Sequence, residues 1–314
     1  MYNVLIVDFS DYKNTIAQEF PNEDYHIEIV ESAFDAMAKL RSHDFDLVIS
    51  EIDIPGDNAF DLHSYIKKNY PYIPIIMTTE NNIDIYFDHI YKEGIGNVLS
   101  KPFSNNEILN IAEKLITKKN LFGIQNYIKD LTETQKIKIT SSNEIQKAIN
   151  LIIKQIGEWG FKNINTKIIN LLLNEIIINA VYHSHGYTKE KENMRHVKLK
   201  DDEFVDIFYA RRGNSFAISI NDYRGKLTKM KILESIKKSI EQSNLILRSM
   251  ETGEEISDMI SETGRGLDLV RKLASEYYFV IDKDVHTEII ILFDNKNLNI
   301  DSRNFNSLKI IECD

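Results

Sequence analysis

The sequence predicts a two-domain protein of the α/β class: a doubly wound parallel sheet followed by an α+β sandwich. In residues 1–120, short apolar runs alternate with helical segments, which is typical of parallel strands buried on both faces. Farther along the chain, long apolar helices are combined with two pairs of short strands joined by turn residues. A length of 314 residues is enough for two hydrophobic cores.

The first domain is expected over residues 1–120, and each of its strands is a short apolar run. We expect strands at 4–7, 47–49, 73–77 and 97–99, and helices at 32–41, 60–69, 83–91 and 105–118. In such a sheet, functional groups gather at the carboxyl ends of the strands. Four polar residues stand at these ends: Asp8, Glu51, Thr79 and Lys101.

Residues 1–120 resemble the receiver domain of bacterial response regulators. The resemblance rests on LIVD at 5–8, DLVISEIDIPG at 46–56, PIIMTT at 74–79 and VLSKPF at 98–103. It implies a five-stranded, flavodoxin-like parallel sheet. It also implies that Thr79 is the switch hydroxyl and that Lys101 is the ammonium group facing the phosphoryl group.

Two positions depart from the receiver pattern. The family has a second acidic residue after the first strand, where this chain has Phe9, and a phosphoacceptor aspartate where this chain has Glu51. A glutamate imitates the charge of an acyl phosphate without being phosphorylated, and Phe9 removes an oxygen ligand that Mg²⁺ needs. We therefore expect a pseudo-receiver. A normal receiver that is phosphorylated on Asp53 or Asp57 stays open as the alternative.

A helical connector is expected over residues 121–140. Apolar residues around its start follow an approximate heptad: Ile108, Ile111, Leu115 and Phe122. The last receiver helix would then continue into the connector. Such a helix would mediate a homodimer or couple the domains. Packing back on its own domain explains the same pattern, and both explanations stay open.

The second domain is expected over residues 141–314. Ser141 and Glu144 have the spacing of a capping box that opens an amphipathic helix. Two hairpins should follow, the first pairing 204–209 with 216–220 and the second pairing 277–281 with 288–293.

One helix of this domain carries a polar stripe on an otherwise apolar surface. It spans residues 166–186, and Glu175, Asn179 and His183 follow at intervals of four, which places them on one face. A carboxylate and an amide inside an apolar helix need polar partners. These partners are either neighbouring backbone groups or a metal ion with phosphates, and a glycine motif downstream favours the second.

Residues 141–293 resemble the GHKL ATPases and, within them, the anti-sigma-factor serine kinases. The resemblance rests on NEIIINAVYHSHGY at 174–187, TGRGLDLV at 263–270, and a threonine before the last strand. It implies that ATP and Mg²⁺ bind and that residues 226–263 form a lid over the phosphates. It further implies a protein partner such as a sigma factor or an anti-anti-sigma protein.

Individual roles follow from residue chemistry and from this resemblance. Asn179 offers an amide oxygen to Mg²⁺, and Glu175 can deprotonate an attacking hydroxyl or water as the catalytic base. The resemblance implies that Asp222 accepts from the adenine amine and that Thr287 supports this contact through water. The other expected nucleotide-binding residues, for the loops and the phosphates, are Gly225, Gly264, Arg265 and Gly266. We interpret His183 as structural.

The box around Asp222 departs from the D-x-G-x-G of the family, because Arg224 and Lys226 replace its glycines. Either Arg224 closes over the adenine site, or Gly225 serves after a shift of one residue. Three functions stay open: an ATP-dependent protein serine/threonine kinase, a non-catalytic nucleotide-gated partner switch, and a plain ATPase.

Charge and composition argue against several partners and compartments. A net charge of −10 without a long basic run argues against direct nucleic-acid binding. The N-terminus has no basic flank before its apolar run, and no window approaches about eighteen uninterrupted apolar residues. We therefore expect neither a signal peptide nor a membrane span. The single cysteine, Cys313, suits a reducing compartment, so we expect a cytoplasmic signalling protein.

Overall fold

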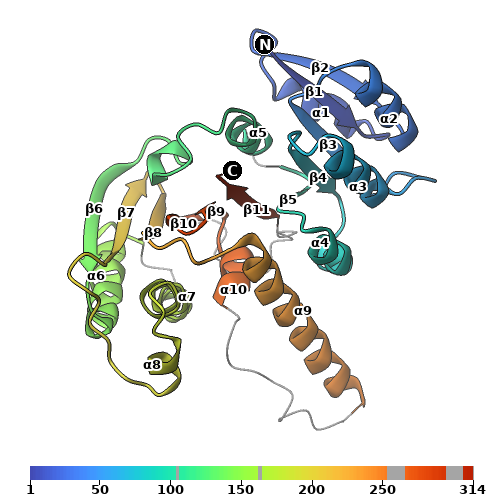
Figure 1. The fold of residues 1–314 in the computed structure, drawn as a ribbon. Coiled ribbons are helices and arrows are strands. Elements are labelled where there is room, and N and C mark those ends of the chain that lie inside the picture. Colours follow the sequence, from blue (N-terminus) through green and yellow to red (C-terminus); the bar gives the residue numbers. More distant parts are fainter. Residues whose placement is uncertain (104–105, 162–164, 253–265, 295–306, 314) are drawn as a thin grey trace. The chain divides into compact units, whose positions relative to one another are not determined.

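The chain folds into two compact units, and each is described by itself (Figure 1). The first unit comprises Met1–Asn120 and Asn304–Ile311, and the second comprises Leu121–Arg303 and Glu312–Asp314. The computed structural model describes residues 1–103, 106–161, 165–252, 266–294 and 307–313, with the side chains of 247–252 excepted.

The first unit is built on a sheet with the strand order β2-β1-β3-β4-β5-β11. Five strands are parallel: β1 (Tyr2–Val7), β2 (Tyr25–Val30), β3 (Leu47–Glu51), β4 (Ile75–Thr79) and β5 (Asn97–Ser100). β11 (Leu308–Glu312) lies antiparallel to β5, with Leu308 opposite Val98. The central strands are buried on both faces, which explains their continuous apolar runs.

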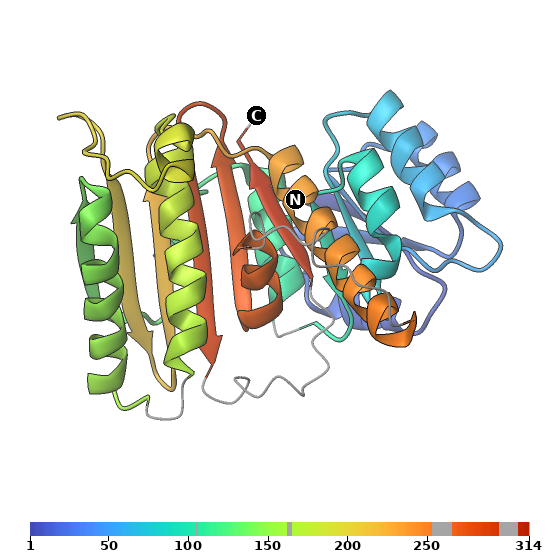
Figure 2. The same ribbon diagram turned by 90° about the horizontal axis from the view of Figure 1, so that it is seen from below.

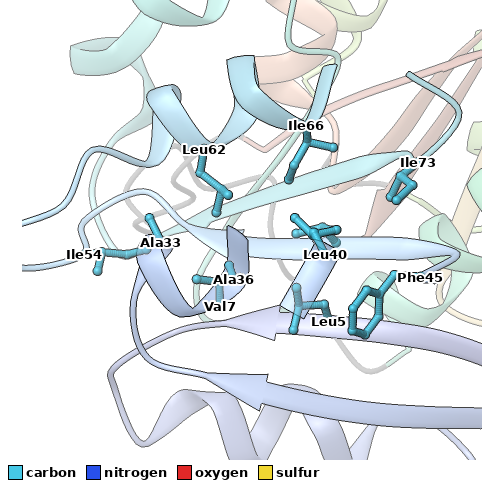
Figure 3. Close-up of a cluster of buried hydrophobic side chains, with 11 residues drawn as sticks. Leu5, Val7, Ala33, Ala36, Leu40, Phe45, Ile54, Leu62, Ile66 and Ile73 are labelled. Atoms are coloured by element: carbon cyan, nitrogen blue, oxygen red, sulfur yellow. The ribbon is translucent and has the colours of Figure 1, made fainter. Parts of the chain in front are cut away.

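Helices pack on this sheet and enclose its core. They are α1 (Tyr12–Gln18), α2 (Ala33–Ser42), α3 (Ala59–Asn69), the 3₁₀ turn η1 (Ile83–Tyr86), α4 (Phe87–Glu93) and α5 (Glu107–Thr117). Figure 3 shows a cluster of buried apolar side chains in this unit, to which α2 contributes Leu40, α3 contributes Leu62 and β1 contributes Leu5. The side chain of Ser32 starts α2 by accepting the N–H of Asp35 at 3.0 Å.

The expected strand–helix alternation is confirmed, but three elements were missed: α1, β2 and β11. β2 is an edge strand in which only Tyr25 is buried and the other residues are partly or fully exposed, so it lacks the apolar run of a central strand. β11 comes from the far end of the chain, and no local pattern reveals its pairing with β5. Assigning all residues after 141 to the second domain was therefore wrong for Leu308–Ile311.

The second unit contains an antiparallel sheet with the strand order β9-β10-β8-β7-β6. The strands are β6 (Thr132–Ile139), β7 (Val205–Arg212), β8 (Ser215–Asp222), β9 (Glu276–Asp282) and β10 (His286–Asp294). Both predicted hairpins are confirmed, because β7 pairs with β8 and β9 pairs with β10.

The helices α6 (Ile145–Glu158, green), α7 (Thr166–Ile178, yellow-green) and α10 (Gly266–Leu273, orange-red) lie on one face of this second sheet, as Figure 2 shows. The helical elements are η2 (Ile124–Asn126), η3 (Ser142–Glu144), α6 (Ile145–Glu158), α7 (Thr166–Ile178), the π-helical turn η4 (Asn179–His183), α8 (Thr188–Glu192), α9 (Lys229–Thr252) and α10 (Gly266–Leu273). The capping box of Ser141 and Glu144 is present and leads into α6, as predicted.

The helical connector was a wrong prediction. α5 ends at Thr117, where Lys118 adopts a left-handed conformation with φ of +52°, and Thr132–Ile139 forms strand β6 beside β7. Ile108 and Ile111 are fully buried, so this part of the heptad pattern reflects packing. A homodimer through a connector helix therefore loses its structural basis.

The polar-stripe helix is also less regular than expected. α7 is followed by one π-helical turn, in which the N–H of Ser184 donates to the carbonyl of Asn179 at 3.1 Å. The wider turn shifts His183 from the strict four-residue stripe. Such π turns inside helices are frequent at functional sites.

Most of the predicted lid, from Lys229 to Thr252, is the long helix α9. Ile232 and Ile236 are fully buried in it, as their helical spacing suggested. The rest of the predicted lid, from residue 253 to 263, lies outside the described residues. No helix in the described parts of the chain has both the length and the apolar character needed to cross a bilayer.

Candidate functional site

Three of the four predicted receiver residues meet at the carboxyl end of the first sheet. Lys101 Nζ donates to Asp8 Oδ2 at 2.7 Å and to Glu51 Oε2. Asp8 follows β1, Glu51 ends β3, and Lys101 follows β5, so the parallel strands bring them together. All three are at most 4% exposed, and they form a buried ionic cluster.

The electrostatics of this cluster keep the lysine charged. Burial lowers the pKa of the Lys101 ammonium, but hydrogen bonds and charge attraction from Asp8 and Glu51 outweigh it, and the pKa is raised. Burial also raises the pKa of the Glu51 carboxyl, against the opposing effect of Lys101. Glu51 Oε1 accepts the backbone N–H groups of Ile52 and Asp53 at 3.0 and 3.1 Å, which fixes the carboxylate.

Thr79 does not join this cluster, although the sequence placed it among the switch residues. Its hydroxyl donates to Asp53 Oδ2 at 2.7 Å, and the hydroxyl of Tyr86 donates to the other Asp53 oxygen. The neighbouring hydroxyl of Thr78, not that of Thr79, donates to Glu51 Oε2 at 3.3 Å. Side chains of adjacent strand residues point to opposite faces of the sheet, so Thr78 and Thr79 contact different carboxylates, those of Glu51 and Asp53.

The aspartates of the alternative reading are engaged elsewhere. Asp53 is held by Thr79 and Tyr86, and Asp57 Oδ2 accepts the N–H of Ala33 at the start of α2 at 2.7 Å. Phe9 is 45% exposed and supplies no oxygen beside Asp8.

The second unit contains a cavity of about 250 Å³, lined by residues from α7, η4, β8, α9, α10 and β10. It brings together four predicted nucleotide-binding residues: Asn179, Asp222, Gly266 and Thr287. Much of its wall is apolar, with Ile176, Ile220, Leu267 and Ile289 around the polar groups. An apolar cavity with a few converging polar groups is the usual form of a small-molecule site.

Asp222 and Thr287 lie side by side on neighbouring strands, because they are register partners of β8 and β10. They are 3% and 2% exposed. Burial raises the pKa of the Asp222 carboxyl, although backbone N–H groups and the hydroxyl of Ser184 oppose the rise. Thr287 Oγ1 is buried and has no hydrogen-bond partner among the described residues. Such an orphaned hydroxyl in a cavity wall is open to a ligand.

The cavity is also lined by α7 and by the start of α10, through Ile176 and Gly266. A Cβ added to Gly266 would lie 2.7 Å from Glu175 Cβ, so only glycine allows this close approach. Glu175 and Asn179 are partly exposed, which differs from the buried pair that the sequence suggested. Gly264 and Arg265 lie outside the described residues.

Basic side chains that the sequence did not assign to the nucleotide line the cavity as well: Lys226, Lys231 and, on η4, His183. Lys191 Nζ lies 3.1 Å from Nε2 of His183, and burial together with Lys191 and Lys231 lowers the pKa of the imidazole. A lone lysine in a lid segment gives no motif, so only the fold could reveal this cluster.

The loop after β8 contains the altered glycine box, and the structure places both Arg224 and Gly225. The backbone N–H groups of Arg224 and Gly225 both donate to Asp222 Oδ1, at 3.1 and 3.0 Å. Gly225 has φ of +56°, so it supplies the left-handed residue of the turn. The guanidinium of Arg224 pairs with Glu203 instead of closing over the cavity.

Comparisons with known proteins concern mainly the first unit. Residues 4–113 match the family described as response regulator receiver domain. The probable transcriptional regulator ycf29 of Pyropia yezoensis is 29% identical over 120 residues, which are 37% of this chain and 54% of that protein. The protein of the same name from Cyanophora paradoxa is 25% identical over 198 residues, covering 57% of this chain and 91% of that protein.

Two further matches cover the same share of this chain, 37%. The DNA-binding transcriptional regulator NtrC of Proteus hauseri is 32% identical over 117 residues, 37% of this chain and 24% of that protein. The solved signal receiver domain of an HD domain-containing protein from Pseudomonas fluorescens Pf-5 is 25% identical; the match covers 37% of this chain and 88% of that one, with a TM-score of 0.35. The chain thus spans only part of the Pyropia and Proteus relatives.

Proposed function

We propose, from the premise that residues 4–113 form a response-regulator receiver domain, that this chain is a signal-transduction regulator whose receiver controls an ATP-binding second domain. In this proposal the second domain resembles the anti-sigma-factor serine kinases and acts on a protein partner such as a sigma factor or an anti-anti-sigma protein. The observation that carries the proposal is the buried pair of Asp222 and Thr287 in the wall of one cavity.

The polar pair suits an adenine base. The Asp222 carboxylate would accept from the exocyclic amine. The Thr287 hydroxyl, which has no partner in the described part of the chain, would support the ring through a bonded water. The apolar wall formed by Ile176, Ile220 and Ile289 would pack on the faces of the base. Asp222 is held in the cavity wall by the N–H groups of Arg224 and Gly225 at Oδ1, and an adenine amine would be a further donor to this carboxylate.

Another part of the cavity wall suits phosphates. Gly266 starts α10, whose free N–H groups favour an anion, and Lys226 and Lys231 add positive charge. Asn179 would offer its amide oxygen to Mg²⁺, which when bound would neutralise phosphate charge. Glu175, which lies against Gly266, would deprotonate the hydroxyl of a protein serine or threonine.

The receiver would act without being phosphorylated. Lys101, which would otherwise face a phosphoryl group, is already held by the two carboxylates of Asp8 and Glu51. Incubation with a small-molecule phosphodonor should leave the intact mass unchanged. A phosphoryl group found on Asp53 or Asp57 would show that the receiver is of the ordinary kind.

Calorimetric titration with Mg-ATP tests the nucleotide site. The wild-type chain should bind, and Asp222→Asn should weaken binding about tenfold or more, because the amide offers a donor to the adenine amine. Asp201→Asn is the control, since Asp201 is exposed in the turn before β7. If millimolar nucleotide gives no heat with the wild-type chain, the second domain does not bind ATP.

A second function, the non-catalytic nucleotide-gated partner switch, is favoured by the engagement of Arg224 with Glu203, which departs from the glycine box of the kinases. Radiolabelled ATP with co-purified partners separates the two functions. Transfer of label to a protein serine, lost in Glu175→Ala and Asn179→Ala, supports the kinase. Nucleotide-dependent partner binding without transfer supports the switch.

A further inference from the structure

The segment that follows the receiver in the chain is fixed to the sheet of the second unit. We call residues 121–128 the linker segment. Leu121, Ile124, Tyr127 and Ile128 are at most 7% exposed, and the hydroxyl of Tyr127 donates to the carbonyl of Leu121 at 2.6 Å. The segment is therefore a packed element of this unit.

Two contacts join the linker segment to strand β10. The backbone N–H of Gly123 donates to Glu288 Oε2 at 2.6 Å, although these residues are 165 positions apart. The ring of Phe122 stacks on His286, with centroids 4.0 Å apart and planes inclined by 16°. Glu288 is 1% exposed, so its hydrogen bond to Gly123 is shielded from water.

Between these two contacts, on the opposite side of the strand, stands Thr287. Successive residues of a strand point to opposite faces, so His286 and Glu288 share the face of the linker segment while Thr287 lines the cavity. The same holds on β8, where Asn221 is the register partner of Glu288 and Asp222 that of Thr287. The pair of Asn221 and Glu288 therefore lies on the linker face, and the neighbouring pair of Asp222 and Thr287 lies on the cavity face of the same two strands.

On the face of the sheet that meets the linker segment, a series of hydrogen bonds ends at the carboxylate of Glu288. Asn221 Oδ1 lies 2.9 Å from His286 Nε2, and Asn221 Nδ2 donates to Ser219 Oγ at 2.7 Å. The Ser219 hydroxyl then donates to Glu288 Oε1, and Gly123 donates to Oε2. Because donors approach both oxygens, the network needs a residue that only accepts, and a glutamine there would set a donor against one of them.

We propose that Glu288 is a positioning residue of the nucleotide site: it ties the linker segment to the strand that carries Thr287, so that linker docking and nucleotide binding strengthen each other. This inference rests on the proposed ATP site and names its regulation. Coupling between two sites is reciprocal. A receiver state that breaks the contact of the linker segment with Glu288 would weaken nucleotide binding. Bound nucleotide would in turn stabilise the docked linker segment.

The test uses the full chain and two readouts: the affinity for Mg-ATP and the hydrogen exchange of residues 121–128 with and without Mg-ATP. In the wild-type chain, Mg-ATP should slow exchange at Gly123. Glu288→Gln should speed that exchange and weaken Mg-ATP binding by about five- to 150-fold, the usual range of such coupling. Glu158→Gln, at an exposed glutamate of α6, should change neither.

A second variant avoids altering a buried charge. Phe122→Leu removes the stack on His286 and should also loosen the segment and weaken Mg-ATP binding. Its matched control is Phe60→Leu, which removes a stack of the same kind on His89 in the first unit, at 4.8 Å and 22°. The control should leave Mg-ATP affinity unchanged.

The possible failures are distinguishable. If the wild-type chain binds no Mg-ATP, the proposed function fails, and this inference fails with it. If the wild-type chain binds Mg-ATP but Glu288→Gln and Phe122→Leu bind it equally well while exchange at Gly123 rises, the inference alone is overturned. The same holds if exchange at Gly123 does not respond to bound Mg-ATP, because the segment is then only a structural cover.

Discussion

Gly225 occupies a place in the second unit that no larger residue fits. It has φ of +56°, and an added Cβ would lie 2.3 Å from the carbonyl oxygen of Asp282 and 2.4 Å from the nitrogen of Val285. Its N–H donates to Asp222 at 3.0 Å, and its carbonyl accepts the N–H of Asp284 at 2.9 Å. The loop after β8 is thereby fastened to the turn between β9 and β10.

We expect Gly225→Ala to destabilise the second unit more than Gly213→Ala does. Both glycines have positive φ, at +56° and +54°, but no atom of the described residues lies within 4 Å of a Cβ at Gly213. The control thus measures only the backbone strain, about 1–3 kcal/mol, while Gly225→Ala adds a clash with rigid backbone atoms. Chemical denaturation measures both. Equal losses of stability would mean that the backbone around Gly225 shifts to accommodate the methyl group with no additional loss of stability.

His286 makes the second unit sensitive to acid. Burial lowers the pKa of its imidazole from 6.5 to about 4, so the unfolded chain takes up the proton first as the pH falls. Its contribution to stability is complete above the unfolded value and is lost as the pH falls towards about 4.

The corresponding prediction compares the wild-type chain with His286→Gln. After a discount for the partly exposed ring, the wild-type unit should lose on the order of 1 kcal/mol more than the variant between about pH 7 and about pH 5. Urea denaturation at the two pH values measures this difference. The buried carboxyl groups are the same in both chains, so their pH-dependent contributions cancel. A parallel decline in both chains would show that His286 is protonated without penalty.

At the scale of single elements, strand β11 completes the sheet of the first unit. Leu308 is fully buried opposite Val98 of β5, and the N–H of Ser100 donates to Ser307 Oγ at 3.1 Å. Lys309 Nζ lies 2.6 Å from Glu107 Oε1 of α5, in a pair that is almost completely buried. A strand from the far end of the chain thus caps an edge that would otherwise offer unpaired backbone groups.

We expect Leu308→Ala to destabilise the first unit by about 2–5 kcal/mol, the usual cost of a cavity in a packed core. Leu171→Ala is the matched control, because Leu171 is 50% exposed and should cost less than about 0.5 kcal/mol. Near-equal midpoints of thermal unfolding for the two variants would show that β11 contributes little to this sheet.

The turn that ends α7 shows how an element can serve the cavity. η4 widens the helix by one residue, and three of its five residues, Asn179, Ala180 and His183, line the cavity. A regular helix would keep Glu175 and His183 on one line with Asn179. The widened turn instead combines a polar lining with continuous packing of α7 against α6 and α10.

At the scale of the whole molecule, each unit has a core of its own. Leu62 is fully buried under α3 in the first unit, and Ile152 is fully buried on α6 in the second. Two cores of this kind allow each unit to unfold as its own cooperative transition.

Calorimetry should therefore show two transitions. Leu62→Ala should lower one of them and Ile152→Ala the other, each by the effect of about 2–5 kcal/mol expected for a core truncation. Mg-ATP at about one hundred times its dissociation constant should stabilise only the second unit, by about 2.7 kcal/mol. One transition that responds equally to both substitutions would mean that the two units unfold together.

Much of this organisation could be predicted from local pattern. The buried central strands, the capping box at Ser141 and the two hairpins all depend on neighbours in the chain, so the sequence alone determined them. The ionic cluster at the carboxyl end of the first sheet was predictable in the same way for Asp8, Glu51 and Lys101, because parallel strands end at one edge.

Only the tertiary structure decided the rest. The pairing of β11 with β5, the placement of Thr79 against Asp53, and the contact of Gly123 with Glu288 join residues far apart in the chain. Such contacts depend on which strand lies beside which and on the face to which each side chain points. Sequence periodicity shows that a residue is buried, but the identity of its neighbour is determined by the packed fold.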